Sequence, residues 1–471
     1  MTTATADDEQ PSLWSTFREA IRGTSADFTK IPIGRAVLLL AVPMVLEMCM
    51  ESVFAVADVF FVGHLHLTDA ISTVGFTESL MTIIYAIAMG LSVGAAATVA
   101  RRVGEGDTDG AARAAVQSII IGLSVGAVVG AVGIAFAPAL LRMMGADEHV
   151  VSTGSTFARV MIGASGGVTL LFMINSVFRG AGDAAIAMRV LWIANAINIT
   201  LGPCLVFGVG PFPRLGVTGA AIGTSIGRWT GVAIQAYVLT RRDARLTIRL
   251  PHLRLDPQVM RSILSISGAA TFQSFVGTAA YMGLVRIISD FGSAAVAGNT
   301  IGIRVFLFAL LPSWGISNAA TTLVGQNLGA GQPDRAEASA WKICVYNTAC
   351  LVAIGIVFLL FAPLIVSAFT DEPEVAGYAV QCLRITSVGF LFYGTAMALT
   401  AAFNGAGDTR TPTIINVVSL WLFQIPLGWV LAHPLRFGPS GAFVALNAGF
   451  TAICFLSVWI FRRGTWKTQR V

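Results

Sequence analysis

Hydrophobic residues fill this chain in long blocks rather than in alternation with polar ones. Twelve blocks are long enough to cross a membrane, and they lie near 36–62, 70–99, 112–141, 153–178, 187–209, 215–240, 262–289, 294–325, 338–369, 375–403, 412–432 and 440–461. The hydrocarbon core of a bilayer is about 30 Å thick, so a helix needs ~20 apolar residues to cross it. Lipid offers the backbone no hydrogen-bond partners, and continuous apolar runs differ from the alternating pattern of barrel strands. The pattern therefore predicts an all-α integral membrane protein with twelve transmembrane helices.

The composition and the placement of charge agree with this prediction. Of the 471 residues, 55% are hydrophobic and 12% are charged, whereas a soluble domain has about 25% charged residues. Most of the 30 Lys and Arg residues, Arg179 among them, lie in the tails and in alternate loops, and the other loops hold only Arg142, Arg214 and Arg436. Basic residues are retained on the cytoplasmic side, so we expect both termini in the cytoplasm. The net charge of +5 thus reflects topology, and we expect no nucleic-acid partner.

The chain repeats itself at a fixed spacing that is close to half of its length. The segment RRVGEGDTD, which contains Gly104, recurs as QNLGAGQPD with Gly329, and FRGAGD with Asp183 recurs at the same spacing as FNGAGD with Asp408. Near the end of each half, LGVTGA recurs as FGPSGA at a slightly shorter spacing. Because each half would contain six helices, both halves have the same orientation in the membrane. The repeat predicts two pseudo-symmetric six-helix bundles.

These boundaries divide the chain into five parts. We expect a cytoplasmic N-terminal tail at 1–35, an N-terminal six-helix lobe at 36–240, a basic cytoplasmic linker at 241–261, a C-terminal six-helix lobe at 262–462 and a cytoplasmic tail at 463–471. Two similar bundles that rock against each other can expose the space between them to each side of the membrane in turn.

Acidic residues inside the predicted spans are concentrated in the first one. Glu47, Glu51 and Asp58 fall within roughly 40° of one another around a helix and cover about 16 Å of its axis. Ionisable groups in hydrocarbon are costly and mark pathways for ions and substrates, so this stripe is predicted to bind a coupling cation or carry a proton. The alternative is structural: the acids pair with arginines inside other spans. Those arginines are Arg159, Arg228, Arg286, Arg304 and Arg384.

Other motifs have simpler interpretations. The GxG segments follow no predicted strand and open no dinucleotide-binding unit, so we interpret them as tight turns in which Asp183 or Asp408 caps the next helix. His64 and His66 lack the carboxylates of a metal site, and the six cysteines are scattered without a paired spacing. We expect no cofactor and no metal centre.

The first span, PMVLEMCMESVFAVADVFFVG at 43–63, together with the GxG loop after the second span and the paired GAGD loops, resembles the multidrug and toxic compound extrusion (MATE) family. The resemblance extends from about Ile33 to Phe461. It implies twelve helices in two lobes and export of cationic or amphipathic toxicants in exchange for sodium ions or protons. It also implies a transporter rather than an enzyme.

Three residues match positions that line the cation site of that family. Asp58 matches its first-helix aspartate, Asn198 its fifth-helix asparagine and Thr224 its sixth-helix threonine. The fifth-helix pattern of the family has an aspartate where NITLGP has Gly202. A site with one carboxylate holds a desolvated sodium ion less well than a site with two. This departure favours protons over a sodium ion at Asp58 and Asn198.

We therefore expect proton movement through Asp58, with Glu51 and Glu47 on the same stripe. Some branches of the family also carry acids in the seventh and tenth helices, where this chain has Gln273 and an apolar run around Gly394. Coupling through the C-terminal lobe is accordingly not expected.

A drug-binding cleft would use methionine and aromatic side chains for adaptable apolar contact. The residues that we expect to line it are Met48, Met81, Phe272, Phe275, Tyr281, Arg304 and Trp314. Among them, Arg304 is the candidate counter-charge to an acid across the cleft.

The sequence thus favours a secondary active antiporter, acting as a monomer in a bacterial cytoplasmic membrane. A flippase for lipids or lipid-linked precursors of the same broad superfamily is the first alternative. An intramembrane enzyme using Glu47 and Glu51 is the second, although no nucleophile with an adjacent base accompanies them. ATP-driven export is excluded because the chain has no phosphate-binding loop, and the repeat fits alternating access better than a static channel.

Overall fold

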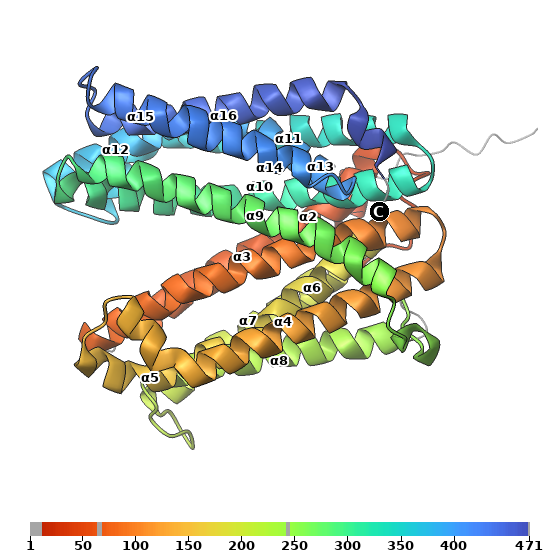
Figure 1. Cartoon of the computed structure of the whole chain (residues 1–471), viewed down its shortest axis with the longest axis horizontal. Coiled ribbons are helices and arrows are strands. Elements are labelled where there is room, and N and C mark those ends of the chain that lie inside the picture. The colour runs from red at the N-terminus through yellow and green to blue at the C-terminus, as the bar shows by residue number, and fades with distance from the viewer. Residues whose placement is uncertain (1–11, 64–67, 242–244, 470–471) are drawn as a thin grey trace, which may run out of the picture.

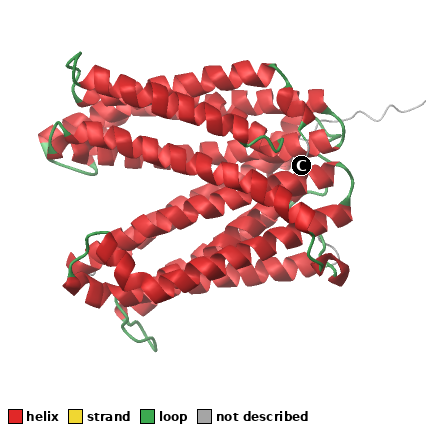
Figure 2. Ribbon diagram, viewed as in Figure 1, coloured by secondary structure: helices red, strands yellow, loops and turns green. Residues whose placement is uncertain are grey.

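The computed structural model describes residues 12–63, 68–241 and 245–469, except for the side chains at 58–63 and 68–72. The described residues form helices and no strand (Figure 2). The N-terminal half contains α1 (Leu13–Arg22), α2 (Ile33–Gly63), α3 (Thr68–Gly104), α4 (Thr108–Met143), α5 (Glu148–Gly163), α6 (Ser165–Ala181), α7 (Ala184–Phe207) and α8 (Val217–Thr240). The C-terminal half contains the short turn η1 (Leu250–Leu253), α9 (Pro257–Ser289), α10 (Ser293–Gly329), α11 (Pro333–Ser367), α12 (Pro373–Val388), α13 (Phe390–Gly405), α14 (Arg410–Asn416), the π-helical η2 (Val417–Gln424), α15 (Ile425–Ala432), α16 (Pro439–Arg462) and η3 (Thr465–Thr468).

Each of the twelve predicted spans corresponds to one helix or to one interrupted helix. Within the described residues, ten segments are long and apolar enough to cross a membrane, and the pair α12–α13, bent by 60°, makes an eleventh. The twelfth is α8, which has 24 residues but is less apolar because it carries Arg228 and Gln235. The all-α membrane fold is confirmed.

The helices form two bundles that spread apart at one end and meet at the other (Figure 1). Helices α2–α8 make the N-terminal lobe, and α9–α16 make the C-terminal lobe. Both described ends of the chain lie where the lobes meet: Arg335 at the start of α11 donates to the carbonyl of Phe28, and Lys467 in the C-terminal tail pairs with Asp334. We call this end the closed end and the other the open end.

Glycines allow the lobes to approach closely at the closed end. A methyl group added at Gly104 of α3 would lie 2.7 Å from the carbonyl carbon of Gln326 in α10, and one added at Gly329 of α10 would lie 2.9 Å from the amide nitrogen of Glu105. Two hydrogen bonds cross the same junction: Gln326 donates to the carbonyl of Gly180 at 2.9 Å, and Thr322 donates to that of Arg179 at 2.9 Å. The two glycines at the junction, Gly104 and Gly329, are therefore corresponding residues of the internal repeat.

The GxG segments do more than turn the chain. The second glycine of each pair is a turn residue with positive φ, as the turn interpretation requires; these residues are Gly106 (75°), Gly182 (87°), Gly331 (69°) and Gly407 (85°). The first glycine instead lies within a helix, where Gly104 and Gly329 pack against the other lobe. Of the two expected caps, Asp408 accepts from Thr411, whereas Asp183 makes no side-chain capping bond.

The register between the halves changes by one residue along the chain. Gly90 of α3 packs on Thr271 of α9, and its counterpart Gly315 packs on Val45 of α2. The two partners, Val45 and Thr271, are one residue farther apart in the sequence than the two glycines are. After η2, corresponding residues of the two halves, such as Gly202 and Gly428, are again one residue farther apart than in the GxG segments. The i→i+5 bonds of a π-helix accommodate one more residue per turn than the bonds of an α-helix do.

Candidate functional site

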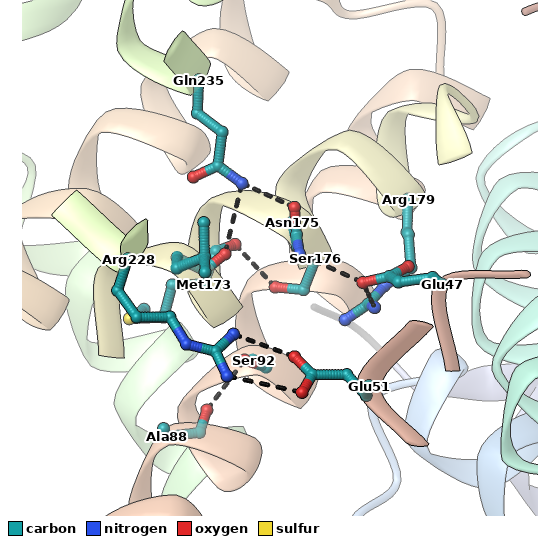
Figure 3. A network of polar contacts seen from close by, with 11 residues as sticks. Glu47, Glu51, Ala88, Ser92, Met173, Asn175, Ser176, Arg179, Arg228 and Gln235 are labelled. Atoms are coloured by element: carbon teal, nitrogen blue, oxygen red, sulfur yellow. Dashed lines mark hydrogen bonds and ion pairs between the residues drawn. The ribbon is translucent and has the colours of Figure 1, made fainter. Parts of the chain in front are cut away.

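Glu47 lies inside the N-terminal lobe, with 1% of its surface exposed. Its Oε1 accepts from Asn175 Nδ2 at 3.1 Å and from Arg179 Nη1 at 3.1 Å, both of α6 (Figure 3). Asn175 and Arg179 are four residues apart and therefore share one face of α6. The guanidinium compensates a buried charge that would otherwise be strongly destabilising.

The network continues from α6 into α8. Gln235, which is fully buried, donates through Nε2 to Asn175 Oδ1 at 2.5 Å and to the carbonyl of Leu171 at 3.4 Å. Asn175 therefore accepts from Gln235 while it donates to Glu47 (Figure 3). A chain of polar groups thus connects α2, α6 and α8 inside the membrane-spanning region.

Glu51 lies one helical turn after Glu47 and binds a different arginine. Arg228 of α8 donates through Nη1 to Oε1 at 2.9 Å and through Nη2 to Oε2 at 3.4 Å (Figure 3). The guanidinium also stacks 5.3 Å from the ring centre of Phe54. The side chain of Arg228 is 4% exposed and that of Glu51 is 19% exposed. Glu51 is therefore the more accessible side chain of this pair.

The fifth and sixth spans meet at the predicted ion-coupling residues. Asn198 of α7 donates to Thr224 Oγ1 of α8 at 2.6 Å, and both are buried. A cavity of about 30 Å³ borders Thr224 and is also lined by Glu78 and Thr77, which is enough space for one water molecule. The side chain of Asp58 lies outside the described residues. The structure thus joins Asn198 to Thr224 and brings Glu78 to the same cavity.

Gly202 allows close packing between α7 and α8. A methyl group added at Gly223 of α8 would lie 3.1 Å from the Cα of Gly202. A methyl group added at Gly202 itself would meet only Asn198 Oδ1, at 3.7 Å, which is ordinary van der Waals contact. The described chain therefore does not crowd the position that a Cβ atom would take at Gly202.

Three of the residues predicted to line a cleft lie on α9. Phe272 is 57% exposed and Phe275 is partly buried. Tyr281 is also partly buried, and its hydroxyl accepts from Asn299 of α10 at 3.1 Å. Phe272 presents the largest accessible surface of the three.

The other apolar residues of that prediction are less accessible. Met81 is 2% exposed and packs with Ile84, Ile162 and Val168 in the interior of the N-terminal lobe. It therefore offers no surface to a cleft in this structure. Met48 and Trp314 are partly buried.

Arg304 lies on the face of α10 that is directed at the N-terminal lobe. The interval from Arg304 to Thr322 is about five whole turns of an α-helix, so the two residues share one side of α10, and Thr322 bonds to the N-terminal lobe through the carbonyl of Arg179. Arg304 is exposed. Of the arginines that were the alternative partners of the acids in the first span, Arg228 pairs with Glu51. Arg286 instead pairs with Asp290 at the end of α9.

Sequence reasoning missed Arg179, Asn175 and Gln235. Arg179 was counted with the loop arginines because it is two residues from the end of α6. The available signal was its spacing of four from Asn175, which places two polar side chains on one face of an otherwise apolar helix.

Known proteins resemble this chain over nearly its full length. The MatE family model matches residues 43–204 and 269–430, one segment in each half of the chain. The probable multidrug resistance protein NorM of Thermotoga maritima is 26% identical over 440 residues, which cover 93% of this chain and 94% of that protein. The FAD transporter of Shewanella oneidensis is 26% identical over 403 residues, or 84% of this chain and 87% of that protein.

Solved structures share the fold. A structure described as the outward-facing conformation of a multidrug resistance MATE family transporter has a TM-score of 0.87 and 24% identity, covering 94% of this chain and 98% of its own. A transporter from Pyrococcus furiosus, described as having a binding pocket of reverse polarity that suggests a different function, also has a TM-score of 0.87 at 24% identity, covering 94% and 98% of the two chains.

Proposed function

The chain belongs to the MatE family, whose members are multi-pass membrane transporters rather than enzymes, and from this premise we propose that it exports cationic or amphipathic small molecules in exchange for protons. The two lobes would expose the cargo to each side of the membrane in turn. Coupling would reside in the N-terminal lobe, at Asp58, Glu51 and Glu47 with the neighbouring Asn198 and Thr224.

The observation that carries this proposal is the pair formed by Glu51 and Arg228. The side chain of Glu51 is partly exposed, whereas that of Arg228 is buried. A proton that reaches Glu51 removes the negative charge that pairs with Arg228, so this contact between α2 and α8 weakens. Proton binding at one accessible group is thereby converted into a change in helix packing.

The same geometry favours a proton over a sodium ion. Glu47 and Glu51 each already have a guanidinium as counter-ion. A hard cation needs several oxygen ligands and uncompensated negative charge, and Gly202 contributes no carboxylate beside Asn198. A proton requires only one accessible carboxylate.

The shape of the molecule supports alternating access. Both described ends of the chain lie at the closed end, which the positive-inside rule assigns to the cytoplasm. The structure then corresponds to an outward-facing state. The glycine contacts at the closed end involve little side-chain interlocking, which suits a junction that must separate and reform.

The cargo that we propose is amphipathic. One relative is named for multidrug resistance and another for transport of FAD, so the names of the relatives indicate more than one kind of cargo. In this chain, Phe272 supplies exposed aromatic surface and Arg304 an exposed charge. We expect contact with the apolar part of the cargo to dominate.

The test uses proteoliposomes that contain the full chain and a fluorescent lipophilic cation, driven separately by a proton gradient and by a sodium gradient. We expect uptake with the proton gradient and its loss, by tenfold or more, in Asp58→Asn and in Glu51→Gln. Glu374→Gln, an exposed acid at the start of α12, is the matched control and should transport normally.

Two results would change the proposal. Uptake driven only by sodium would replace the proton with a cation bound near Asp58 and Asn198. No uptake with either gradient, from protein shown to be folded, would favour the flippase alternative, and translocation of a fluorescent phospholipid would then be measured in the same vesicles.

A further inference from the structure

A cavity of about 500 Å³ opens at the closed end of the C-terminal lobe, away from the polar network of the N-terminal lobe. It lies between the start of α9, the turn from α13 to α14, and the C-terminal tail. Its lining includes Arg261, Ser262, Ser265, Gly407, Asp408 and Arg410. The volume is within the range of small-molecule sites, and the lining is mostly polar.

The charges of the cavity are unevenly compensated. Arg261 and Arg410 are both exposed, and neither guanidinium forms a hydrogen bond or an ion pair with another described residue. The acid in the lining is Asp408, which is 7% exposed and accepts from the amide and the hydroxyl of Thr411 at 3.2 Å and 2.7 Å. The accessible charged groups are therefore the two guanidinium groups.

The corresponding corner of the N-terminal lobe is built from different residues. By the spacing of the repeat, Ser262, Ser265 and Arg410 correspond to Ala36, Leu39 and Ala185. These three apolar residues are 1%, 2% and 3% exposed. At these three positions, buried apolar residues of the N-terminal lobe are replaced by more accessible polar residues that line the cavity.

The N-terminal corner is also covered by its own chain. Phe28 and Arg245 both lie against Gly182, where an added methyl group would be 2.6 Å from each side chain, and Gly23 lies against Ala185. Arg245 in addition donates to the carbonyl of Gly182 at 3.0 Å. No described segment covers Gly407 and Arg410 in this way, so the C-terminal corner is open.

We infer that this cavity is a binding site for a phosphate-bearing anion. A guanidinium group donates pairs of parallel hydrogen bonds to phosphate oxygens, and two such groups, those of Arg261 and Arg410, line the cavity. The hydroxyls of Ser262 and Ser265 add donors, and the volume exceeds that of phosphate alone, so a larger group carrying the phosphate fits. The site is distinct from the proposed transport pathway and does not depend on it.

Two sources can supply such a group. Arg261 lies four residues after the start of α9, and Arg410 is the first residue of α14, so both lie at the level of lipid head groups if the closed end faces the cytoplasm. Basic pockets at this level bind anionic lipid head groups. A soluble phosphate compound from the cytoplasm would use the same donors.

The experiment measures binding to the purified full-length chain by native mass spectrometry and by thermal shift. The probes are a short-chain phosphatidylglycerol, phosphatidylcholine of the same chain length, and glycerol 3-phosphate. We expect phosphatidylglycerol or glycerol 3-phosphate to bind at least tenfold more tightly than phosphatidylcholine. Lipid binding alone identifies the head group as the source, and binding of both probes identifies the phosphate itself.

The variants separate a built site from general attraction to a basic surface. Arg261→Gln and Arg410→Gln should each weaken binding by tenfold or more. Arg254→Gln removes an exposed charge from the neighbouring linker and should change binding by less than twofold. Ser265→Leu keeps every charge but introduces leucine, which is the residue at the corresponding position 39 of the N-terminal lobe, into the cavity. This variant should also abolish binding.

Equal binding of phosphatidylglycerol and phosphatidylcholine, with no binding of glycerol 3-phosphate, would overturn the inference. Equal losses in Arg254→Gln and Arg261→Gln would overturn it as well, because the attraction would then come from the surface and not from the cavity. If Arg410→Gln fails to fold, Ser265→Leu decides the question.

Discussion

The two lobes share a backbone plan but differ in what fills their interiors. In the N-terminal lobe, Glu47 and Arg179 form a buried ion pair at 3.1 Å. By the spacing of the repeat, the C-terminal lobe has Gln273 and Asn404 at these positions. A charged pair in one lobe thus stands where neutral amides stand in the other.

The second pair shows the same contrast. Arg228 corresponds to Phe450 by the shorter spacing at the end of each half. Phe450 stacks on Tyr393, with ring centres 4.0 Å apart, and on Phe306 at 6.0 Å. Aromatic packing of this kind does not change with pH or with ion binding.

The difference indicates a division of labour between the lobes. An ion pair inside a membrane protein is retained at a cost and marks a candidate functional site. An aromatic and amide interior gives a lobe that moves as one body. On the proposed mechanism, the N-terminal lobe responds to protons while the C-terminal lobe provides the rigid surface against which it moves.

The largest expected effect comes from breaking the buried pair. Arg179→Asn leaves Glu47 without its counter-charge and should lower the free energy of unfolding by about 3–5 kcal/mol. The double variant Glu47→Gln with Arg179→Asn installs the amides of the C-terminal lobe and should recover most of that loss. Thermal unfolding of the purified variants measures both effects.

Arg384→Asn serves as the control for this comparison. Arg384 is exposed on α12 and its side chain makes no hydrogen bond or ion pair with another described residue, so its loss should change stability by less than about 0.5 kcal/mol. If the double variant is no more stable than Arg179→Asn, then Glu47 does not depend on charge compensation, and the contrast between the lobes loses its energetic basis.

The glycines of the closed end test whether the lobes contribute equally to their junction. Gly104→Ala and Gly329→Ala each place a methyl group against the backbone of the other lobe, and each should weaken closure by about 1–3 kcal/mol, as overpacking does. Gly277→Ala is the control, because no atom lies within 4 Å of the added group.

Closure is measured as the distance distribution between spin labels at the exposed positions Thr108 and Ala338, in a background without native cysteines. Both glycine variants should shift the distribution toward longer distances. An effect of only one of them would show that the junction is not symmetric.

A smaller effect is expected from restoring an acid beside Asn198. The Cβ atom of Gly202→Asp would be in ordinary contact with Asn198 Oδ1 at 3.7 Å, whereas that of Gly428→Asp, its counterpart in the C-terminal lobe, would meet Leu284 at 3.0 Å and Ala445 at 3.3 Å. We expect Gly202→Asp to increase sodium affinity about tenfold, or ~1.4 kcal/mol, and Gly428→Asp to destabilise the protein without binding sodium. Sodium-dependent thermal shifts of the two variants distinguish these outcomes, and equal sodium responses would contradict the proposed role of Gly202.

The smallest effect concerns the covered corner of the N-terminal lobe. Burial raises the pKa of Asp183 above its ordinary value of 3.8, and the nearby Arg189 and Arg245 only partly oppose it. The folded state therefore favours the protonated form, and this contribution to stability is fully present below pH 3.8 and is lost as the pH rises through the folded-state pKa. Asp183→Asn should make the melting temperature less dependent on pH above 3.8, and an unchanged slope would contradict the assignment.

Much of the fold was predictable because the signals are local. The twelve apolar blocks match helices or interrupted helices, since the free energy of placing a segment in lipid depends mainly on its own residues. The placement of Asn198 beside Thr224 was predicted from family positions, and the hydrogen bond between them agrees with it.

The packing of single side chains was less predictable. Met81 was expected to face a cleft but is buried among Ile84, Ile162 and Val168. Gly104 and Gly329, the first glycines of two GxG segments, were interpreted as turn residues but serve as contacts between the lobes. Both depend on which helices lie side by side, and the periodicity of one helix does not contain that information.

The sequence by itself determined the membrane class, the number of spans, the two-fold repeat and the concentration of acids in the first span. Only the tertiary structure decided which charges meet. Glu47 is 132 residues from Arg179, and Glu51 is 177 residues from Arg228. It also decided that one corner of the repeat is covered while the other is open. Hydrophobicity and glycine spacing act within one helix or turn, whereas pairing of charges depends on how distant helices pack, which local composition does not specify.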